Sequence, residues 1–298
     1  MRILATAAVL ALAPAAAFAN CAGVQPVQVN QVRIDPLDAQ GPAEVLQPFT
    51  LSFNRASADD APVMIEYQIM DEDSPVRARV GDFKGPTVDF AARDTGKNVA
   101  VFRSDAFSPL QAGRVVIPAG RQSASTEVFL RVTDLRADLA AGVYRESFTV
   151  RFRCSPDQAM ADEANGAVNV AVAVPNVLSA NVAGASTRGE IDFLDFAMLE
   201  RSLAVNVRST GPYRISARSL NGGEMRREGA AVLQPSDRIA YEARLDGKVL
   251  KPDSTALRME RAGLLGHRFS LDVEVESVES KRAGLYADTL LLTLTPVN

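Results

Sequence analysis

Alternation of apolar and polar residues over short segments constrains this 298-residue chain more than any other feature. Successive side chains of a strand point to opposite faces of a sheet, so a period of two indicates half-buried β-strands. Helical periodicity is absent apart from one possible turn at 197–201. Many short strands predict an all-β protein with two immunoglobulin-like β-sandwiches in tandem. The clearest runs are 49–53, 64–69, 128–132, 148–152, 168–174, 203–207, 239–243 and 271–275.

The first residues have the form of a secretory signal. Arg2 precedes the apolar run 3–17, and Ala17-Phe18-Ala19 has the small-x-small pattern that signal peptidase cuts. Residues 1–19 are therefore predicted to be a signal peptide. No later run approaches the roughly 18 apolar residues that cross a bilayer, so we expect an exported chain without a transmembrane segment.

Cys21 and Cys154 are the two cysteines of the chain. In an oxidising compartment a disulfide between them is the default expectation. Closing a loop of this length removes about 4–5 kcal/mol of unfolded-state entropy in the chain-entropy model. A lipoprotein anchored at Cys21 is a disfavoured alternative, because Asn20 rather than a small residue precedes it. The other disfavoured alternative is that the cysteines serve as a free nucleophile or a metal ligand.

The predicted disulfide suggests a domain boundary just after its second cysteine. The segment 155–167 is polar, small in its side chains and without alternation. A chain of this length permits two domains of ordinary size. We therefore predict an N-terminal sandwich over 20–154, a linker over 155–167 and a second sandwich over 168–298. With a formal charge of −4, the chain has no excess of positive charge that would attract phosphate groups, which argues against a nucleic-acid partner.

A weak internal repeat supports the tandem arrangement. In each copy a glycine can supply a turn, and a tyrosine two residues later opens the last strand. Its ring can enter the core while its hydroxyl bonds nearby backbone, as in the tyrosine corner of immunoglobulin-like sandwiches. For either copy taken alone, the alternative is an ordinary strand of the kind that any β protein contains. The aligned segments are Thr50–Arg55 with Leu203–Arg208, and Gly142–Val150 with Gly284–Leu292.

The final apolar strand, 290–295, has no later residues with which to pair. A sheet edge with bare backbone donors and acceptors is normally blunted or covered. We therefore expect another chain to supply the neighbour of this strand. Leu290, Leu292 and Leu294 would lie on one face of it.

Six pieces of the second half follow one another with a recognisable order and spacing: Gly189–Phe193, Leu203–Val207, Gly211–Ser216, Asn221–Gly223, Ile239–Ala243 and Ala283–Leu290. Together they resemble the spore coat protein U domain, a family that includes subunits of archaic chaperone-usher pili. The chain departs from the family at Leu194, where a glycine is common, and its second half lacks the cysteines often found there. The first half matches only through its last strand and general pattern.

The resemblance implies that the second sandwich lacks its last strand. A periplasmic chaperone fills the gap during export, and the amino-terminal extension of a neighbouring pilus subunit then replaces it. The implied partners are this chaperone, an usher and the strand-donating subunit, with no cofactor, and the implied location is the cell surface or the extracellular medium. The acceptor edge would include Tyr286, Leu290, Leu292 and Leu294.

No donor arm is visible before the first domain, because the mature chain reaches Cys21 almost at once. This arrangement resembles a two-domain tip subunit with an adhesive N-terminal domain. In the alternative, Cys21 is unpaired and Val24, Val27, Val29 and Val32 belong to a donor segment.

Four phenylalanines, Phe83, Phe90, Phe102 and Phe107, lie among Gly, Pro and Asp residues in the first half. On loops at one end of a sandwich they could form an adhesive surface. Inward-facing core residues are the favoured interpretation. The absence of tryptophan weakens a sugar-stacking site.

The sequence offers little for catalysis. His267 is the only histidine and has no serine or cysteine motif beside it, so we expect a surface or turn histidine. Asp71-Glu72-Asp73 could bind calcium, but three acids in a turn are more often solvated. We predict neither an enzyme nor a metal site. A periplasmic pilus chaperone and a free-standing secreted β-sandwich binding protein, or an enzyme hidden on that scaffold, are the alternatives, which fold alone does not separate.

Overall fold

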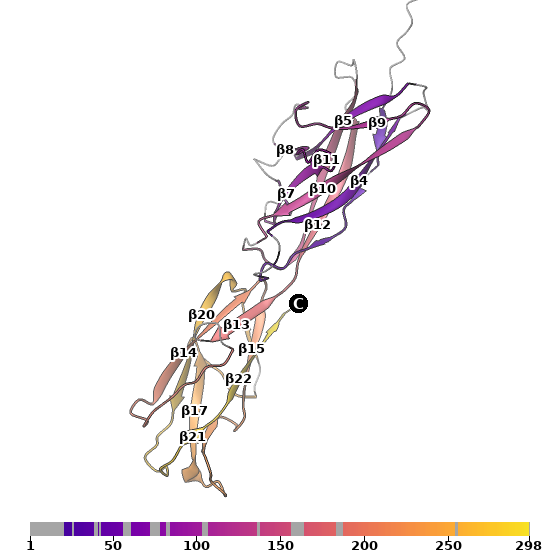
Figure 1. The fold of residues 1–298 in the computed structure, drawn as a ribbon. Helices are drawn as coiled ribbons and strands as arrows, with labels where there is room; N and C mark the ends of the chain where they lie inside the picture. The colour runs from indigo at the N-terminus through magenta and orange to yellow at the C-terminus, as the bar shows by residue number, and fades with distance from the viewer. Residues whose placement is uncertain are drawn as a thin grey trace, which may run out of the picture.

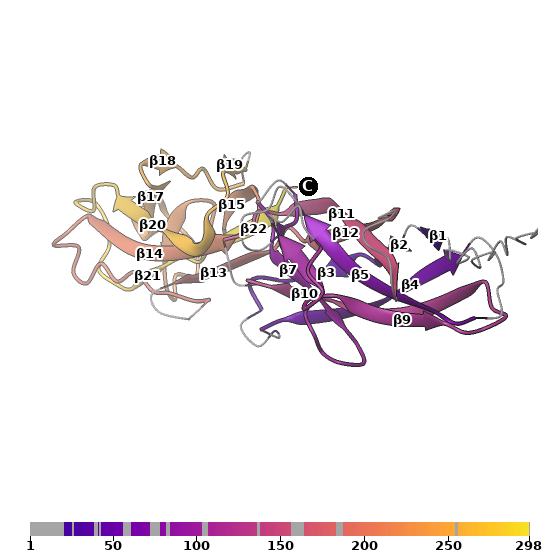
Figure 2. The ribbon, with the colours of Figure 1, turned by 90° about the horizontal axis from the view of Figure 1, so that it is seen from above.

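The computed structural model describes residues 21–297, with gaps at 26, 39–40, 42, 56–60, 72–77, 82–83, 103–106, 136–137, 156–163, 183–186 and 254–255. The predicted signal peptide, Glu72, Asp73 and Phe83 lie outside the described residues, as does the side chain of Cys21. Within them the regular structure is β except for one 3₁₀ turn, η1 (Pro235–Asp237). The all-β prediction is confirmed, and no described helix is long and apolar enough to cross a membrane. Figures 1 and 2 show two elongated groups of strands arranged end to end.

The first sandwich contains two sheets. The first sheet has the order β1-β4-β10-β7-β6, with β1 Cys21–Val24, β4 Val45–Arg55, β10 Ser123–Thr133, β7 Thr87–Ala92 and β6 Ala78–Arg79. The second has the order β2-β12-β11-β5-β8, with β2 Val27–Gln28, β12 Ala164–Val174, β11 Gly142–Ser155, β5 Val63–Asp71 and β8 Ala100–Phe102. Off this path, β3 (Val32–Arg33) pairs with β12 and β9 (Gly113–Ile117) with β5.

The alternating residues of these strands form the first core. Leu51 and Phe53 of β4 are fully buried, as the period of two predicts for the inner face. The Phe53 ring lies 5.5 Å from that of Phe152 on the facing sheet, at an interplanar angle of 69°. Such edge-on aromatic pairs add to the stabilisation that burial alone provides.

The boundary predicted between the domains is wrong. Strand β12 pairs along its length with β11, from Phe152↔Ala164 to Gly142↔Val174. Its valines Val168, Val170, Val172 and Val174 are buried in the first core. The segment expected as a linker therefore joins two strands of one sheet, and the chain crosses to the second sandwich after Val174. Alternation identifies a strand without saying to which sheet it belongs.

The second sandwich also contains two sheets. The larger has the order β13-β14-β20-β17-β16-β21, with β13 Leu178–Val182, β14 Glu200–Ser209, β20 Gly263–Val275, β17 Arg238–Leu245, β16 Glu224–Arg227 and β21 Tyr286–Ala287; β18 (Lys248–Val249) pairs with β17. The smaller has the order β19-β15-β22, with β19 Leu257–Met259, β15 Tyr213–Ser219 and β22 Leu290–Pro296.

The backbone of β1 lies beside that of β11. The strands that contain Cys21 and Cys154 are therefore neighbours, as a disulfide between these two cysteines requires. The disulfide stays a prediction, because the side chain of Cys21 is not described.

The repeated tyrosines form matching corners in both sandwiches. The Tyr144 hydroxyl donates to the Ala140 carbonyl at 2.8 Å, and the Tyr286 hydroxyl donates to the Arg282 carbonyl at 2.7 Å, four residues upstream in each case. The glycines two residues before them, at positions 142 and 284, have φ values of 156° and 153°, which favour glycine. The glycine and tyrosine of the repeat read from the sequence therefore have the same structural role in both copies.

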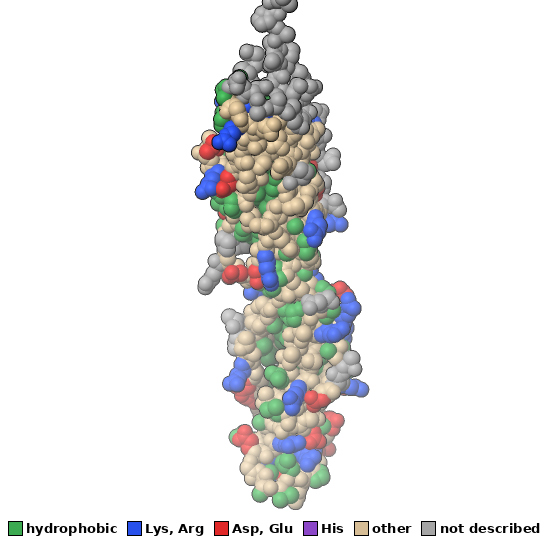
Figure 3. Space-filling view, turned by 90° about the vertical axis from the view of Figure 1, so that its right-hand side faces the viewer, with side chains coloured by type: hydrophobic (Ala, Val, Ile, Leu, Met, Phe, Trp, Pro, Cys, Tyr) green, Lys and Arg blue, Asp and Glu red, His purple; other side chains and the backbone are tan. Residues whose placement is uncertain are grey.

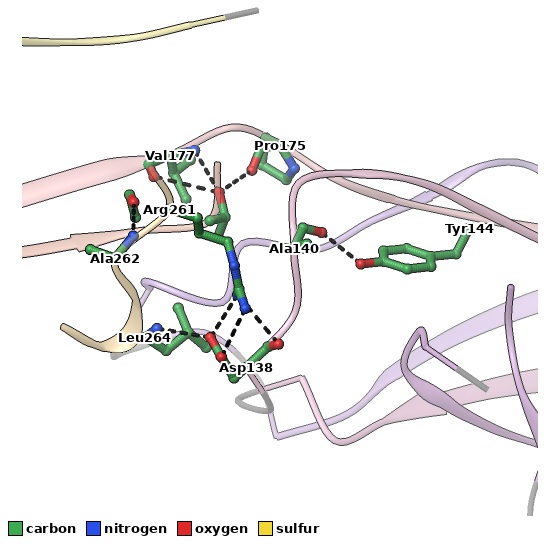
Figure 4. A network of polar contacts seen from close by, with 10 residues as sticks. Asp138, Ala140, Tyr144, Pro175, Val177, Arg261, Ala262 and Leu264 are labelled. Carbon is green, nitrogen blue, oxygen red and sulfur yellow. Dashed lines mark hydrogen bonds and ion pairs between the residues drawn. The ribbon is translucent and has the colours of Figure 1, made fainter. Parts of the chain in front are cut away.

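Polar contacts connect the two sandwiches at one corner (Figure 4). The Arg261 guanidinium donates to both carboxylate oxygens of Asp138, at 2.8 and 3.0 Å, and the Leu264 N–H donates to the same carboxylate at 3.0 Å. The Ala141 N–H donates to the Thr210 carbonyl at 2.7 Å. The hydrogen bond from Leu264 and the Arg261 charge hold the pKa of Asp138 below its ordinary value.

We expect the tyrosine corners to stabilise each sandwich through one hydroxyl. Tyr144→Phe and Tyr286→Phe should each lower the free energy of unfolding by about 1 kcal/mol, because backbone carbonyls lose a donor. Tyr213→Phe is the matched control, since its buried hydroxyl has no hydrogen-bond partner among the described residues. Chemical denaturation of the mature chain measures all three. Equal losses at the three positions would contradict the assignment.

The Asp138 contact should depend on pH. Because its folded-state pKa is depressed, its contribution is present above the unfolded-state pKa of about 3.9 and is lost as pH falls through the lower folded value. Since the side chain is half exposed, Asp138→Asn should cost only about 0.5–1 kcal/mol at pH 7, and this difference should shrink toward pH 3. Asp253→Asn, which removes an exposed carboxylate 3.9 Å from Arg218, is the control for the loss of one surface charge. Thermal unfolding against pH tests both variants.

Candidate strand-acceptor edge

Strand β22 is an edge strand of the described structure. It pairs along its length with β15, from Ser219↔Leu290 to Tyr213↔Pro296, and with no other described strand. Leu290, Leu292 and Leu294 are half-buried against the second core, whereas the side chains between them are exposed. The three leucines thus share one face of β22, as predicted. One backbone edge of the strand has no partner among the described strands.

Strand β13 is the corresponding edge of the larger sheet. Among the described strands it pairs with β14 alone, and every residue of β13 is half-buried. Leu178, Ala180 and Val182 pack against the same core as the leucines of β22. Sequence reasoning missed this strand, because small alanine weakens an apolar alternation of only five residues.

Strand β13 begins, and strand β22 ends, at the same corner of the sandwich. Leu178 is opposite Ser209 at the end of β14, and Pro296 is opposite Tyr213 at the start of β15, so residues 209–213 connect the sheets between them. The Asn176 side-chain amide donates to the Val297 carbonyl at 2.7 Å. Contacts between β13 and β22 confirm that these edges are neighbours.

The second core is less enclosed than the first. Among the described residues, the first core has thirty buried apolar side chains and seven half-buried ones around it, whereas the second has fifteen and fourteen. Six of those fourteen belong to β13 and β22. Figure 3 views the side of the molecule where β22 lies in Figure 1, and hydrophobic side chains reach the surface of the second sandwich there. Incomplete burial is therefore concentrated where both sheets have unpaired backbone.

Tyr286 does not share this edge. It lies on β21, opposite Arg227 of β16 in the larger sheet. Its ring packs against the second core, and its hydroxyl is bonded in the tyrosine corner. The structure brings the three leucines together but separates this fourth predicted residue from them.

The predicted adhesive phenylalanines do not form one surface in the described residues. Phe90 is fully buried in β7, and Phe102 is half-buried against the first core. Phe107 is half-buried, with the Arg153 guanidinium 4.5 Å from the centre of its ring. For Phe90 the favoured core interpretation is therefore correct.

The residues considered for catalysis or metal binding are dispersed. His267 has an exposed side chain on β20, with its Nε2 3.5 Å from an Asp246 carboxylate oxygen. Asp71 ends β5, and its two acidic neighbours are not described. In the described part of the chain, no group of three or more His, Cys, Asp or Glu side chains is placed to hold a metal ion.

The loop before β14 closes the far end of the second core. The Phe193 and Phe196 rings stack with centroids 6.1 Å apart, and Phe196 meets Tyr286 edge-on at 6.5 Å. Leu194 has a φ of 53°, a left-handed conformation that favours glycine. The departure from the resembled family therefore places a strained leucine where glycine is common.

Leu194→Gly should relieve this strain. The side chain is 70% exposed, so little burial is lost, and the net gain should be a few tenths to about 1 kcal/mol after the entropy cost of glycine. Leu285→Gly is the control, because Leu285 is 74% exposed and does not have a positive φ. It should be neutral or destabilising. A fall in the melting temperature of Leu194→Gly would contradict the strain interpretation.

No protein-family model and no curated protein matches this chain, so the spore coat protein U resemblance stays a prediction. Solved structures with a similar fold include the CsuC–CsuE chaperone–tip adhesion subunit pre-assembly complex of archaic Csu pili from Acinetobacter baumannii, with 11% identity, a TM-score of 0.46, and coverage of 92% of this chain and 99% of that chain. A mutant of the CFA/I adhesin CfaE from enterotoxigenic E. coli has 13% identity, a TM-score of 0.47, and coverage of 92% and 93%.

The CupB6 tip adhesin from Pseudomonas aeruginosa is also similar, with 13% identity, a TM-score of 0.41, and coverage of 92% of this chain and 93% of that chain. At these identities and TM-scores the likenesses support no functional conclusion.

Proposed function

We propose that the second sandwich accepts a β-strand from another chain, and that the protein is an exported subunit of a surface fibre linked by such strands. The observation that carries this proposal is the pair of neighbouring edge strands, β13 and β22, with a row of half-buried apolar side chains on each. An added strand would satisfy the unpaired backbone groups of an edge. Its alternating apolar side chains would complete the burial of both rows.

A place at the tip of the fibre agrees with how the first sandwich uses its amino-terminal residues. Val29 and Val32 are buried in the first core, and β2 and β3 pair in parallel with β12. Val24 of β1 is buried in the same core. These valines complete their own sandwich, which disfavours the alternative that they form a donor segment. The chain would then accept a strand without donating these residues.

This function requires partners during export. An apolar edge that awaits a strand is an aggregation hazard until it is covered. A periplasmic chaperone would cover β22 first, an usher would exchange it for the neighbouring subunit, and the first sandwich would contact the target surface. No catalytic step is part of this function. A free-standing binding protein, in contrast, would be stable without any added strand.

The mature chain should be stabilised by a peptide of alternating apolar residues. At a peptide concentration near 100 Kd, binding to the folded state alone adds about 2.7 kcal/mol, which raises the melting temperature on the order of 10 °C. A peptide of the same sequence with alternate backbone amides N-methylated should have no effect, because its ladder hydrogen bonds are removed.

Two leucine variants give a matched comparison. Leu292→Lys introduces a charge into the half-buried row and should abolish the stabilisation by peptide, whereas Leu291→Lys changes a side chain that is 54% exposed and should preserve it. A wild-type chain that is monomeric, stable and indifferent to the peptide would overturn the proposal in favour of the free-standing binding protein.

A further inference from the structure

A small polar cavity lies on the outer face of the larger sheet of the second sandwich, where β13, β14 and β20 meet. Its volume is about 160 Å³. The strand order places it beside the β13 edge, and the segment that begins β20 contacts Asp138 of the first sandwich. The cavity is lined by Ser179, Asn181, Asn206, Arg208 and the segment Leu265–Arg268.

The strand register gathers these side chains on one face. Asn181 is opposite Asn206, and Asn206 is opposite Arg268, so the three form one row across three strands. Ser179 and Arg208 form the next row. Directly opposite residues of antiparallel strands point to the same side, so this face presents hydroxyl, amide and guanidinium groups together.

The cavity has two cations and no anion. Arg208 and Arg268 are exposed, and neither guanidinium group has a hydrogen bond or ion pair to another described residue. Among the lining residues, His267 contacts a carboxylate, with its Nε2 3.5 Å from an oxygen of Asp246. The side-chain oxygen of Asn181 is buried and has no hydrogen-bond partner among the described residues. The site therefore offers unused donors for a negative charge and an unused acceptor for a hydroxyl group.

The wall of the cavity is built around Gly266. This residue has a φ of 82°, and a Cβ atom there would lie 2.9 Å from the Arg208 side chain and 3.1 Å from the Val207 carbonyl oxygen. Glycine thus lets the turn approach Arg208 closely. The preceding residue, Leu265, is fully exposed and supplies an apolar surface at the rim.

We propose that this cavity binds one acidic sugar unit. The guanidinium groups of Arg208 and Arg268 would hold its carboxylate, and the amides of Asn181 and Asn206 would bond its hydroxyl groups, because an amide both donates and accepts. Leu265 would contact its apolar face. A saccharide fits this set better than an acidic peptide, since the neutral polar groups outnumber the cations.

This site is distinct from the strand-acceptor edge. Ser179 and Asn181 are on the outward face of β13, whereas Leu178, Ala180 and Val182 pack against the core. Sugar binding therefore does not require strand addition, and either property can fail without the other.

Calorimetric titration of the mature chain with an oligogalacturonate tests the proposal. We expect its methyl ester, which keeps the hydroxyl groups but loses the charge, to bind at least tenfold more weakly. The double variant Arg208→Gln, Arg268→Gln should lose at least tenfold in affinity for the acid. The control, Arg214→Gln with Arg258→Gln, changes two exposed arginines that are opposite each other on the smaller sheet and should keep wild-type affinity.

Four results would overturn the proposal. Equal binding of acid and ester would remove the role of the charge. Equal losses in the two double variants would show general electrostatic attraction instead of a site. No binding at millimolar oligogalacturonate, or equal binding of a polyglutamate peptide, would exclude an acidic sugar as the ligand.

Discussion

One-sided pairing of β22 is the constraint on which the second sandwich depends. Among the described strands, β22 has one hydrogen-bonded neighbour, β15, and its other side faces the region beside β13. Its leucines reach the core without being enclosed by it. Because backbone groups and apolar side chains are left incomplete at the same place, one added strand would satisfy both.

The first sandwich completes its sheets with amino-terminal strands of its own chain. Its amino-terminal strands β1, β2 and β3 pair with β4 and β12, and Val29 and Val32 are buried between the sheets. The resulting core includes side chains with no solvent exposure, such as Leu51, Phe53 and Leu130. The two sandwiches share a tyrosine corner, and under the proposed function they differ in whether the chain itself supplies the strand that completes the core.

Local signals in the sequence predicted the elements better than their partners. Period-two alternation identified β12 correctly, yet assigned it to the wrong domain, because pairing with β11 is decided by a hairpin and not by composition. The leucines of β22 were predicted as one face, whereas the facing edge β13 was missed. Nearness in sequence groups Tyr286 with those leucines, although β21 belongs to the other sheet. Which edges become neighbours depends on long-range packing.

The corner at residues 209–213 connects the acceptor edges to the first sandwich. Thr210 donates its hydroxyl to the Pro175 carbonyl at 2.7 Å and accepts the Val177 N–H at 2.9 Å, while its carbonyl accepts the Ala141 N–H. Asn176, between these segments, bonds the end of β22 through Val297. The start of β13, the end of β22 and the first sandwich are therefore bonded to one short stretch of backbone. A strand added between the edges would occupy a position fixed relative to the first sandwich.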